Sequence, residues 1–132
     1  MVKYMSIAEF SFANLRIWPN GIVEVKVFEG VKLDLSHIVE LQNYIDHNIS
    51  SYFGLLINRQ NRYEHSASSF QQTLKWSPKL KAMAVVYQLR VDQYLQEINE
   101  EIYGLKSNIE IEHFENYGDA FCWLEAKLSS EK

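Results

Sequence analysis

Apolar and polar residues alternate along the first part of the chain in the way that extended strands require. In residues 22–30, three valines alternate with a glutamate and a lysine: Val23, Glu24, Val25, Lys26 and Val27. This period of two predicts a strand with its valines on one face. Residues 9–18 also alternate, and Pro-Asn-Gly at 19–21 is typical of a tight turn. The two segments therefore predict a β-hairpin.

Further along the chain, apolar residues recur every three or four positions, which predicts amphipathic helices. The first follows Asp34, a residue suited to an N-cap, and its apolar stripe is Leu35, Ile38, Leu41, Ile45 and Ile49. Residues 66–76 and 91–104 are expected to form two more helices. The last helix should be capped by Asn116, and its inner face should hold Tyr117, Ala120, Phe121, Leu124 and Leu128.

Three segments of strand length lie between these helices, at residues 52–58, 82–89 and 108–114. Residues 82–89 are apolar at odd and even positions alike, as in a strand that is covered on both faces. After the hairpin, strands and helices alternate, which predicts an α/β fold. We expect a mostly parallel sheet of four or five strands, covered by about four helices.

The size and composition of the chain agree with one globular domain. Its 132 residues are 47% hydrophobic and 23% charged, which is ordinary for such a domain. We expect a single domain over residues 1–132, with residues 1–8 as an N-terminal extension and residues 129–132 as a C-terminal tail. The net charge of −4 offers no positive surface for nucleic acid or an acidic membrane.

The single cysteine and the short apolar runs bear on the compartment. Cys122 has no partner for an intramolecular disulfide, which suits a reducing compartment, and its place in a helical pattern indicates a small packing residue. No apolar run is long enough to cross a bilayer, and the first residues lack a signal-peptide pattern. We therefore expect a cytoplasmic protein without membrane contact.

The pattern resembles the small STAS-like domains, which share the fold of anti-sigma-factor antagonists and of sulfate-transporter cytoplasmic domains. The stretches that carry the resemblance are GIVEVKVFEGVKLDLSHIVEL, FGLLIN and KAMAVVY, with Phe114, Asp119, Ala120, Trp123 and Leu124 of the closing helix. It covers residues 10–128 and implies a non-enzymatic domain that works by protein–protein contact. The antagonists carry a phosphorylated serine in an Asp-Ser-Gly step, whereas residues 57–70 here read INRQNRYEHSASSF without that step.

Few residues form a constellation that could carry chemistry. The five glycines are isolated and the four histidines lie on separate elements, so we expect no phosphate loop, no metal, no cofactor and no enzymatic activity. One segment combines cations with a helix start that could hold an anion: Arg59, Arg62, His65, Ser66 and Ser69. It is our candidate contact surface, and an ordinary polar loop with a serine cap is the simpler interpretation.

The expected function is therefore that of a STAS-like interaction domain with an unknown protein partner. A homodimer is one form of this hypothesis, because some of the many aromatic residues could be exposed: Tyr4, Phe10, Tyr63 and Trp76. The alternative is a domain that binds a small apolar ligand or a lipid in a pocket between the sheet and the helices.

Overall fold

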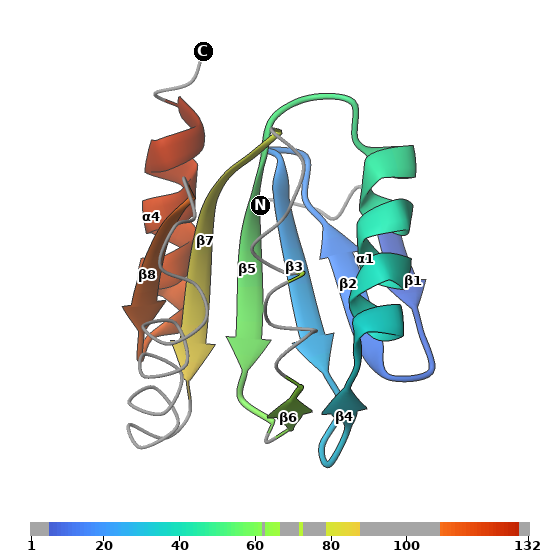
Figure 1. The fold of residues 1–132 in the computed structure, drawn as a ribbon. Helices are drawn as coiled ribbons and strands as arrows, with labels where there is room; N and C mark the ends of the chain where they lie inside the picture. Colours follow the sequence, from blue (N-terminus) through green and yellow to red (C-terminus); the bar gives the residue numbers. More distant parts are fainter. Residues whose placement is uncertain (1–5, 62, 67–71, 73–78, 88–108, 130–132) are drawn as a thin grey trace.

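The computed structural model describes residues 6–61, 63–66, 72, 79–87 and 109–129. The elements in chain order are β1 (Ser6–Glu9), β2 (Ala13–Ile17), β3 (Ile22–Val27), β4 (Lys32–Leu33), α1 (Leu35–Asn48), β5 (Phe53–Arg59), β6 (Glu64–His65), β7 (Leu80–Tyr87), β8 (Glu110–Phe114) and α4 (Tyr117–Ser129). The described residues thus form an α/β domain (Figure 1).

Six strands form one mixed sheet in the order β1-β2-β3-β5-β7-β8, and β4 pairs with β6 in a separate small sheet. β1 is antiparallel to β2 and β2 to β3, while β3, β5, β7 and β8 run parallel to one another. The sheet is therefore mixed, not mostly parallel, and it has more strands than the four or five expected. The alternation of strands and helices detects the parallel part only, because antiparallel neighbours need no helix between them.

The extra strand comes from the beginning of the chain. The predicted strand at 9–18 is interrupted, since the Phe10 N–H donates to the Ala13 carbonyl at 2.8 Å and closes a turn between β1 and β2. Residues 6–8, expected to belong to an N-terminal extension, form the edge strand β1 together with Glu9 and pair with β2. The hairpin between β2 and β3 is confirmed, and Gly21 adopts a φ of 91° in its turn.

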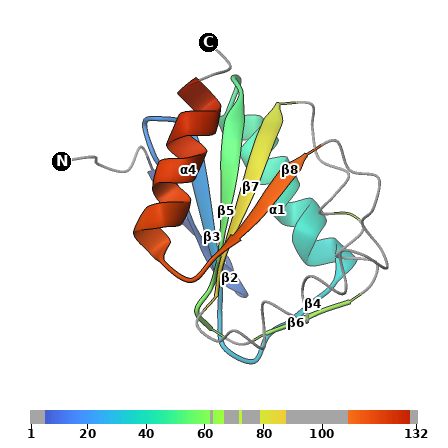
Figure 2. The same ribbon diagram turned by 90° about the vertical axis from the view of Figure 1, so that its left-hand side faces the viewer.

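Helices α1 and α4 lie on opposite faces of the sheet (Figure 2). On α1, the side chains of Ile38, Leu41 and Ile45 are buried as predicted. Leu35 is 44% exposed because it lies at the margin of the apolar stripe, and Gln42 is buried in its place. The Gln42 side-chain amide donates to the Gln72 backbone carbonyl at 2.9 Å, and the Gln72 side-chain amide donates to Gln42 Oε1 at 2.8 Å.

Of the four predicted helices, two are described. α4 begins as predicted, because the Asp119 N–H donates to the Asn116 side chain at 3.0 Å, and it extends to Ser129, into the expected tail. The helix predicted at 91–104 lies outside the described residues, and Ser66 and Gln72 are the described residues of the helix predicted at 66–76.

The interior strand β7 confirms the prediction for residues 82–87, whereas residues 88 and 89 of the predicted strand lie outside the described residues. It lies between β5 and β8, and all its residues except Lys81 are buried. Met83, Val85 and Tyr87 join the core on the α1 side, while Ala82, Ala84 and Val86 pack with α4 on the other side. Both parities are apolar because both faces of this strand are covered.

Candidate functional site

On the face of the sheet that carries α4, two rows of cross-strand neighbours are polar on β2 and β3 and apolar on β7. One row of cross-strand neighbours consists of Glu9, Asn14, Lys26, Asn58, Val86 and Phe114, from β1 to β8. The next row consists of Ile7, Arg16, Glu24, Leu56, Ala84 and Glu112. Both rows are polar on β2 and β3 and apolar on β7, and α4 packs over β5 and β7.

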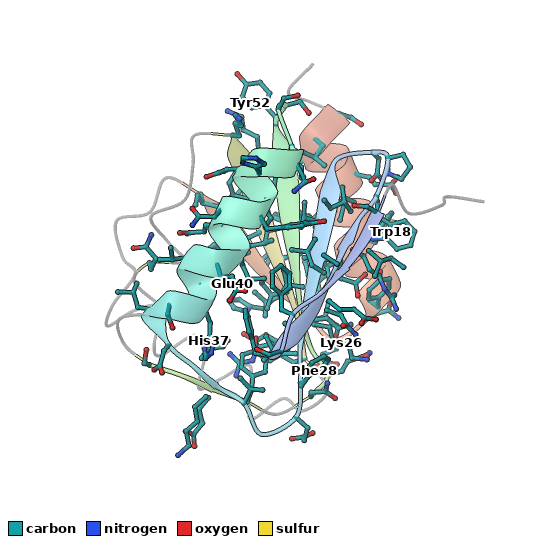
Figure 3. The ribbon with its side chains drawn as sticks, turned by 90° about the vertical axis from the view of Figure 1, so that its right-hand side faces the viewer. Trp18, Lys26, Phe28, His37, Glu40 and Tyr52 are labelled. Carbon is teal, nitrogen blue, oxygen red and sulfur yellow. The ribbon has the colours of Figure 1, made fainter. Side chains whose placement is uncertain are left out.

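The polar half of this face lies on the opposite side of the sheet from α1, and Figure 3 shows Trp18 on the same side. We call it the β2–β3 polar face and define it by Asn14, Arg16, Glu24, Lys26 and Asn58. Helix α4 meets it at one border, where the Phe121 ring packs edge-on against Trp18 with centroids 5.3 Å apart.

Glu24 is the buried residue at the centre of the β2–β3 polar face, with only 3% of its surface exposed. The Tyr117 hydroxyl donates to Glu24 Oε1 at 2.6 Å, and the Asn58 amide donates to Oε2 at 3.3 Å. Arg16 is its cross-strand neighbour on β2. Buried carboxylates need such donors, because an unsatisfied one carries a large desolvation cost. The carboxylate is thus held by groups from α4 and β5.

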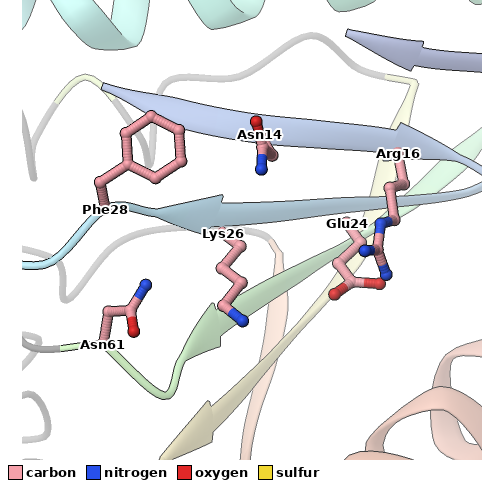
Figure 4. A pocket seen from close by; sticks show the side chains of 6 residues that line it. All are labelled: Asn14, Arg16, Glu24, Lys26, Phe28 and Asn61. Atoms are coloured by element: carbon pink, nitrogen blue, oxygen red, sulfur yellow. The ribbon is translucent and has the colours of Figure 1, made fainter. Parts of the chain in front are cut away.

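An open cavity of about 240 Å³ lies over this face. Its walls are formed by Asn14, Arg16, Glu24, Lys26, Phe28 and Asn61 (Figure 4). The lining is polar except for the Phe28 ring, so this cavity does not support the alternative of an apolar or lipid ligand.

A second polar region lies where the parallel strands end. The Arg59 guanidinium donates to the Tyr63 carbonyl at 3.1 Å and lies 4.2 Å from the centre of the Tyr63 ring. The Tyr87 hydroxyl and His113 Nδ1 are 3.1 Å apart. Burial raises the pKa of the Tyr63 hydroxyl above its usual range, and the nearby Arg59 charge partly offsets this. The side chains of Arg59, Tyr63, Tyr87 and His113 thus pack together at this edge.

The structure places three residues of the predicted contact surface, Arg59, His65 and Ser66, at this same edge. Arg59 ends β5, His65 belongs to β6, and the Ser66 N–H donates to the Leu33 carbonyl at 3.0 Å. Arg62 and Ser69 lie outside the described residues. Arg59 is partly buried against two tyrosine rings, so it stabilises the loop in addition to any role in binding.

The aromatic residues proposed to be exposed give a different picture. Tyr63 is only 7% exposed, and Phe10 packs against the core through Phe12 and Tyr44. Tyr4 and Trp76 lie outside the described residues.

Cys122, expected to be a packing residue, is exposed on α4. It occupies the outer side of that helix, whereas Leu124 occupies the inner side.

No sequence motif predicts the β2–β3 polar face. Its residues are far apart in the sequence and form no motif, so only strand pairing brings them together. The sequence does carry one signal, because alternate positions of two neighbouring strands are polar. These positions are Asn14 and Arg16 on β2, and Glu24 and Lys26 on β3. A polar parity on a central strand such as β3 indicates a face without apolar cover.

Comparison with solved structures confirms the expected fold. The chain is similar to an uncharacterised protein of the DUF3478 family from Shewanella loihica, which has a SpoIIAA-like fold. The TM-score is 0.57 at 15% sequence identity, and the alignment covers 93% of each chain. The domain therefore has a STAS-like fold. No known family matches the sequence, and no curated protein matches it either.

Within the described ranges, no three His, Cys, Asp or Glu side chains are grouped so that they could hold a metal ion. In the same part of the chain, no helix is both long and apolar enough to cross a membrane.

Proposed function

We propose that the chain is a non-enzymatic, cytoplasmic interaction domain that acts by contact with another protein. The proposal is supported by the STAS-like fold and by a polar surface beside the carboxyl ends of the parallel strands. We call this the carboxyl-end surface and define it by the described residues Gln60, Glu64 and Ser66. The proposed contact also includes the sequence-predicted Arg62, His65 and Ser69, of which Arg62 and Ser69 lie outside the described residues.

The observation that carries the proposal is that the loop after β5 is held in place by several side chains. Asn58 Oδ1 accepts the Gln60 N–H at 3.1 Å, and the Asn61 amide donates to the Val27 carbonyl at 3.0 Å. Arg59 and Tyr63 hold the next residues, and β6 pairs with β4. A loop ordered in advance loses less conformational entropy on binding, which favours recognition of a partner.

Photo-crosslinking from single positions tests this proposal in the native host. A crosslinking residue at Gln60 or Glu64, both exposed, should capture a protein that a matched probe at exposed Glu40 on α1 does not. Capture from Glu40 alone would place the contact on another surface. Arg62→Glu should weaken capture from Gln60. Arg59→Glu is unsuitable for this purpose, since Arg59 holds the loop.

A homodimer remains one proposed form of this function. Its support is now the edge strand β1, where Ile7 is 53% exposed, because unpaired edge strands are ready sites for pairing with another chain. Light scattering should then show a mass above the 15.5 kDa of one chain. Ile7→Lys should lower the measured mass to that of a monomer. A monomer mass for the unsubstituted protein would contradict the homodimer.

A further inference from the structure

The cavity over the β2–β3 polar face has a local charge opposite to that of the whole chain. Two of its six lining side chains are cations, Arg16 and Lys26, and one is an anion, Glu24. The net formal charge of the lining is therefore +1, whereas the chain carries −4. Concave walls of low dielectric strengthen such a local potential, so the cavity favours a negatively charged occupant.

The Glu24 carboxylate does not cancel this potential at the open side of the cavity. Both of its oxygens accept hydrogen bonds, from Tyr117 and Asn58, and its surface is nearly all buried. Figure 4 shows the Arg16 side chain beside Glu24. Arg16 and Glu24 are also direct partners in the strand register. We therefore assign these two residues to the wall of the cavity, as a pair of opposite charges, so the charge that binds an anion belongs to another lining residue.

Lys26 supplies that charge. It lies in the middle of the central strand β3, is partly buried, and points into the cavity between β2 and β5 (Figure 4). Among the described residues, its ammonium group has no hydrogen bond or ion pair. Its register neighbours are the amides Asn14 and Asn58, and the carboxylate of that row, Glu9, is exposed and lies two strands away. A partly desolvated ammonium beside amide donors is the arrangement that binds an oxyanion.

We propose that the cavity binds the carboxylate or phosphate group of a small polar metabolite, with Lys26 as its charge partner. Asn14 offers amide donors, Asn61 offers the second N–H of an amide that already donates to the Val27 carbonyl, and the Phe28 ring forms an apolar wall for the rest of the ligand. The volume of about 240 Å³ lies below the usual range for larger organic ligands, so the occupant is compact. This site adjoins the carboxyl-end surface, because its lining residue Asn61 follows Gln60 in the loop after β5, but it does not depend on the proposed protein contact.

NMR titration of the ¹⁵N-labelled chain at constant ionic strength tests the site. Inorganic phosphate and succinate are the two probes, and sodium chloride is the control for non-specific anion effects. We expect saturable shifts of the amide signals of residues 14, 16, 26 and 61 with at least one probe. Saturation by phosphate alone assigns a phosphate ligand, and saturation by succinate alone assigns a carboxylate. Shifts that do not saturate, or that chloride reproduces, overturn the proposal.

Matched substitutions identify the residue that binds. Lys26→Met should weaken binding about tenfold or more, because it removes a charged hydrogen-bond donor. Lys81→Met is the control, since Lys81 lies near the start of β7 over the Tyr52 ring, and it should bind as the unsubstituted chain does. Asn14→Ala is a second variant that keeps the charge and should weaken binding less. Equal affinities of all four proteins would show that the cavity is not the site.

Discussion

The two faces of the sheet are made by the same strands, yet they differ in what covers them. On the α1 side, the residues of β2, β3, β5 and β7 belong to one apolar core that includes Leu15, Val25, Leu55 and Val85. On the α4 side, the buried apolar residues of β5 and β7 lie where the helix covers the sheet, and the β2–β3 polar face lies beside them. On β2, β3, β5 and β7, the polarity of each face therefore depends on whether a helix covers it.

This difference separates stability from binding within one sheet. Burial of apolar side chains on the α1 side stabilises the fold, and each fully buried side chain contributes about 1.5–3 kcal/mol. Asn14, Arg16 and Lys26 of the β2–β3 polar face are only partly buried, so these three side chains can vary without loss of a large apolar area. A face of this kind can acquire a ligand while the opposite face holds the domain together.

Neighbouring residues of β3 give the strongest test of the comparison. Val25 faces the α1 core and is 2% exposed, whereas Lys26 faces the cavity. Val25→Lys would bury an unpaired charge and should lower the free energy of unfolding by about 3–5 kcal/mol or prevent folding. Lys26→Val should change it by less than about 1 kcal/mol. Urea unfolding measures both, and similar midpoints for the two variants would contradict the assignment of the faces.

The cover that α4 provides is tested at Leu124, which is fully buried against the sheet. Leu124→Ala should lower the free energy of unfolding by about 2–5 kcal/mol, through lost burial and a residual cavity. The contact is close, because a Cβ added at Gly54 would lie 3.0 Å from a Leu124 methyl carbon. Cys122→Ala on the exposed side of α4 is the matched control and should change urea unfolding little. A small loss for Leu124→Ala would mean that α4 contributes little to the core.

The boundary between α4 and the polar face is tested at Tyr117. Tyr117→Phe removes the donor 2.6 Å from Glu24 Oε1 and leaves that oxygen without this partner. We expect the free energy of unfolding to fall by about 1–3 kcal/mol. Tyr52→Phe makes the same chemical change at a side chain that is 52% exposed and serves as the control. Equal urea midpoints for the two variants would show that the hydrogen bond from the Tyr117 hydroxyl to Glu24 does not contribute to stability.

Comparison of the two faces also shows which features could be predicted from the sequence. Residues 82–87 are apolar at both odd and even positions, and this pattern identified an interior strand. A strand that is covered on both faces needs an apolar residue at every position. The N-cap at Asn116 was also predicted, since a side chain and an N–H three residues later suffice for it. Both features depend on local sequence alone.

Other features depend on pairing between distant segments and could not be read in this way. β1 has four residues, too few for a clear period, and only its pairing with β2 reveals it. The cavity requires β2, β3 and the loop after β5 to come together. Polar alternation on β3 was visible in the sequence, but it did not show that α4 packs over β5 and β7 and reaches Glu24 on β3 through Tyr117. Side-chain packing over a sheet is a tertiary property.

The smallest expected effect concerns a polar group within the α1-side core. Tyr63 belongs to that core and its hydroxyl pKa is raised, first by burial, with Arg59 acting in the opposite direction. Because the folded state favours the neutral hydroxyl, its contribution to stability is fully present below about pH 10, the ordinary tyrosine value. It is lost as the pH rises from there through the raised value. Tyr63→Phe cannot ionise, so its urea midpoint should fall less steeply than that of the unsubstituted chain above about pH 10. Parallel declines would show that this hydroxyl ionises as easily in the folded core as in the unfolded chain, and that the α1 side is wetter at this edge than its apolar composition implies.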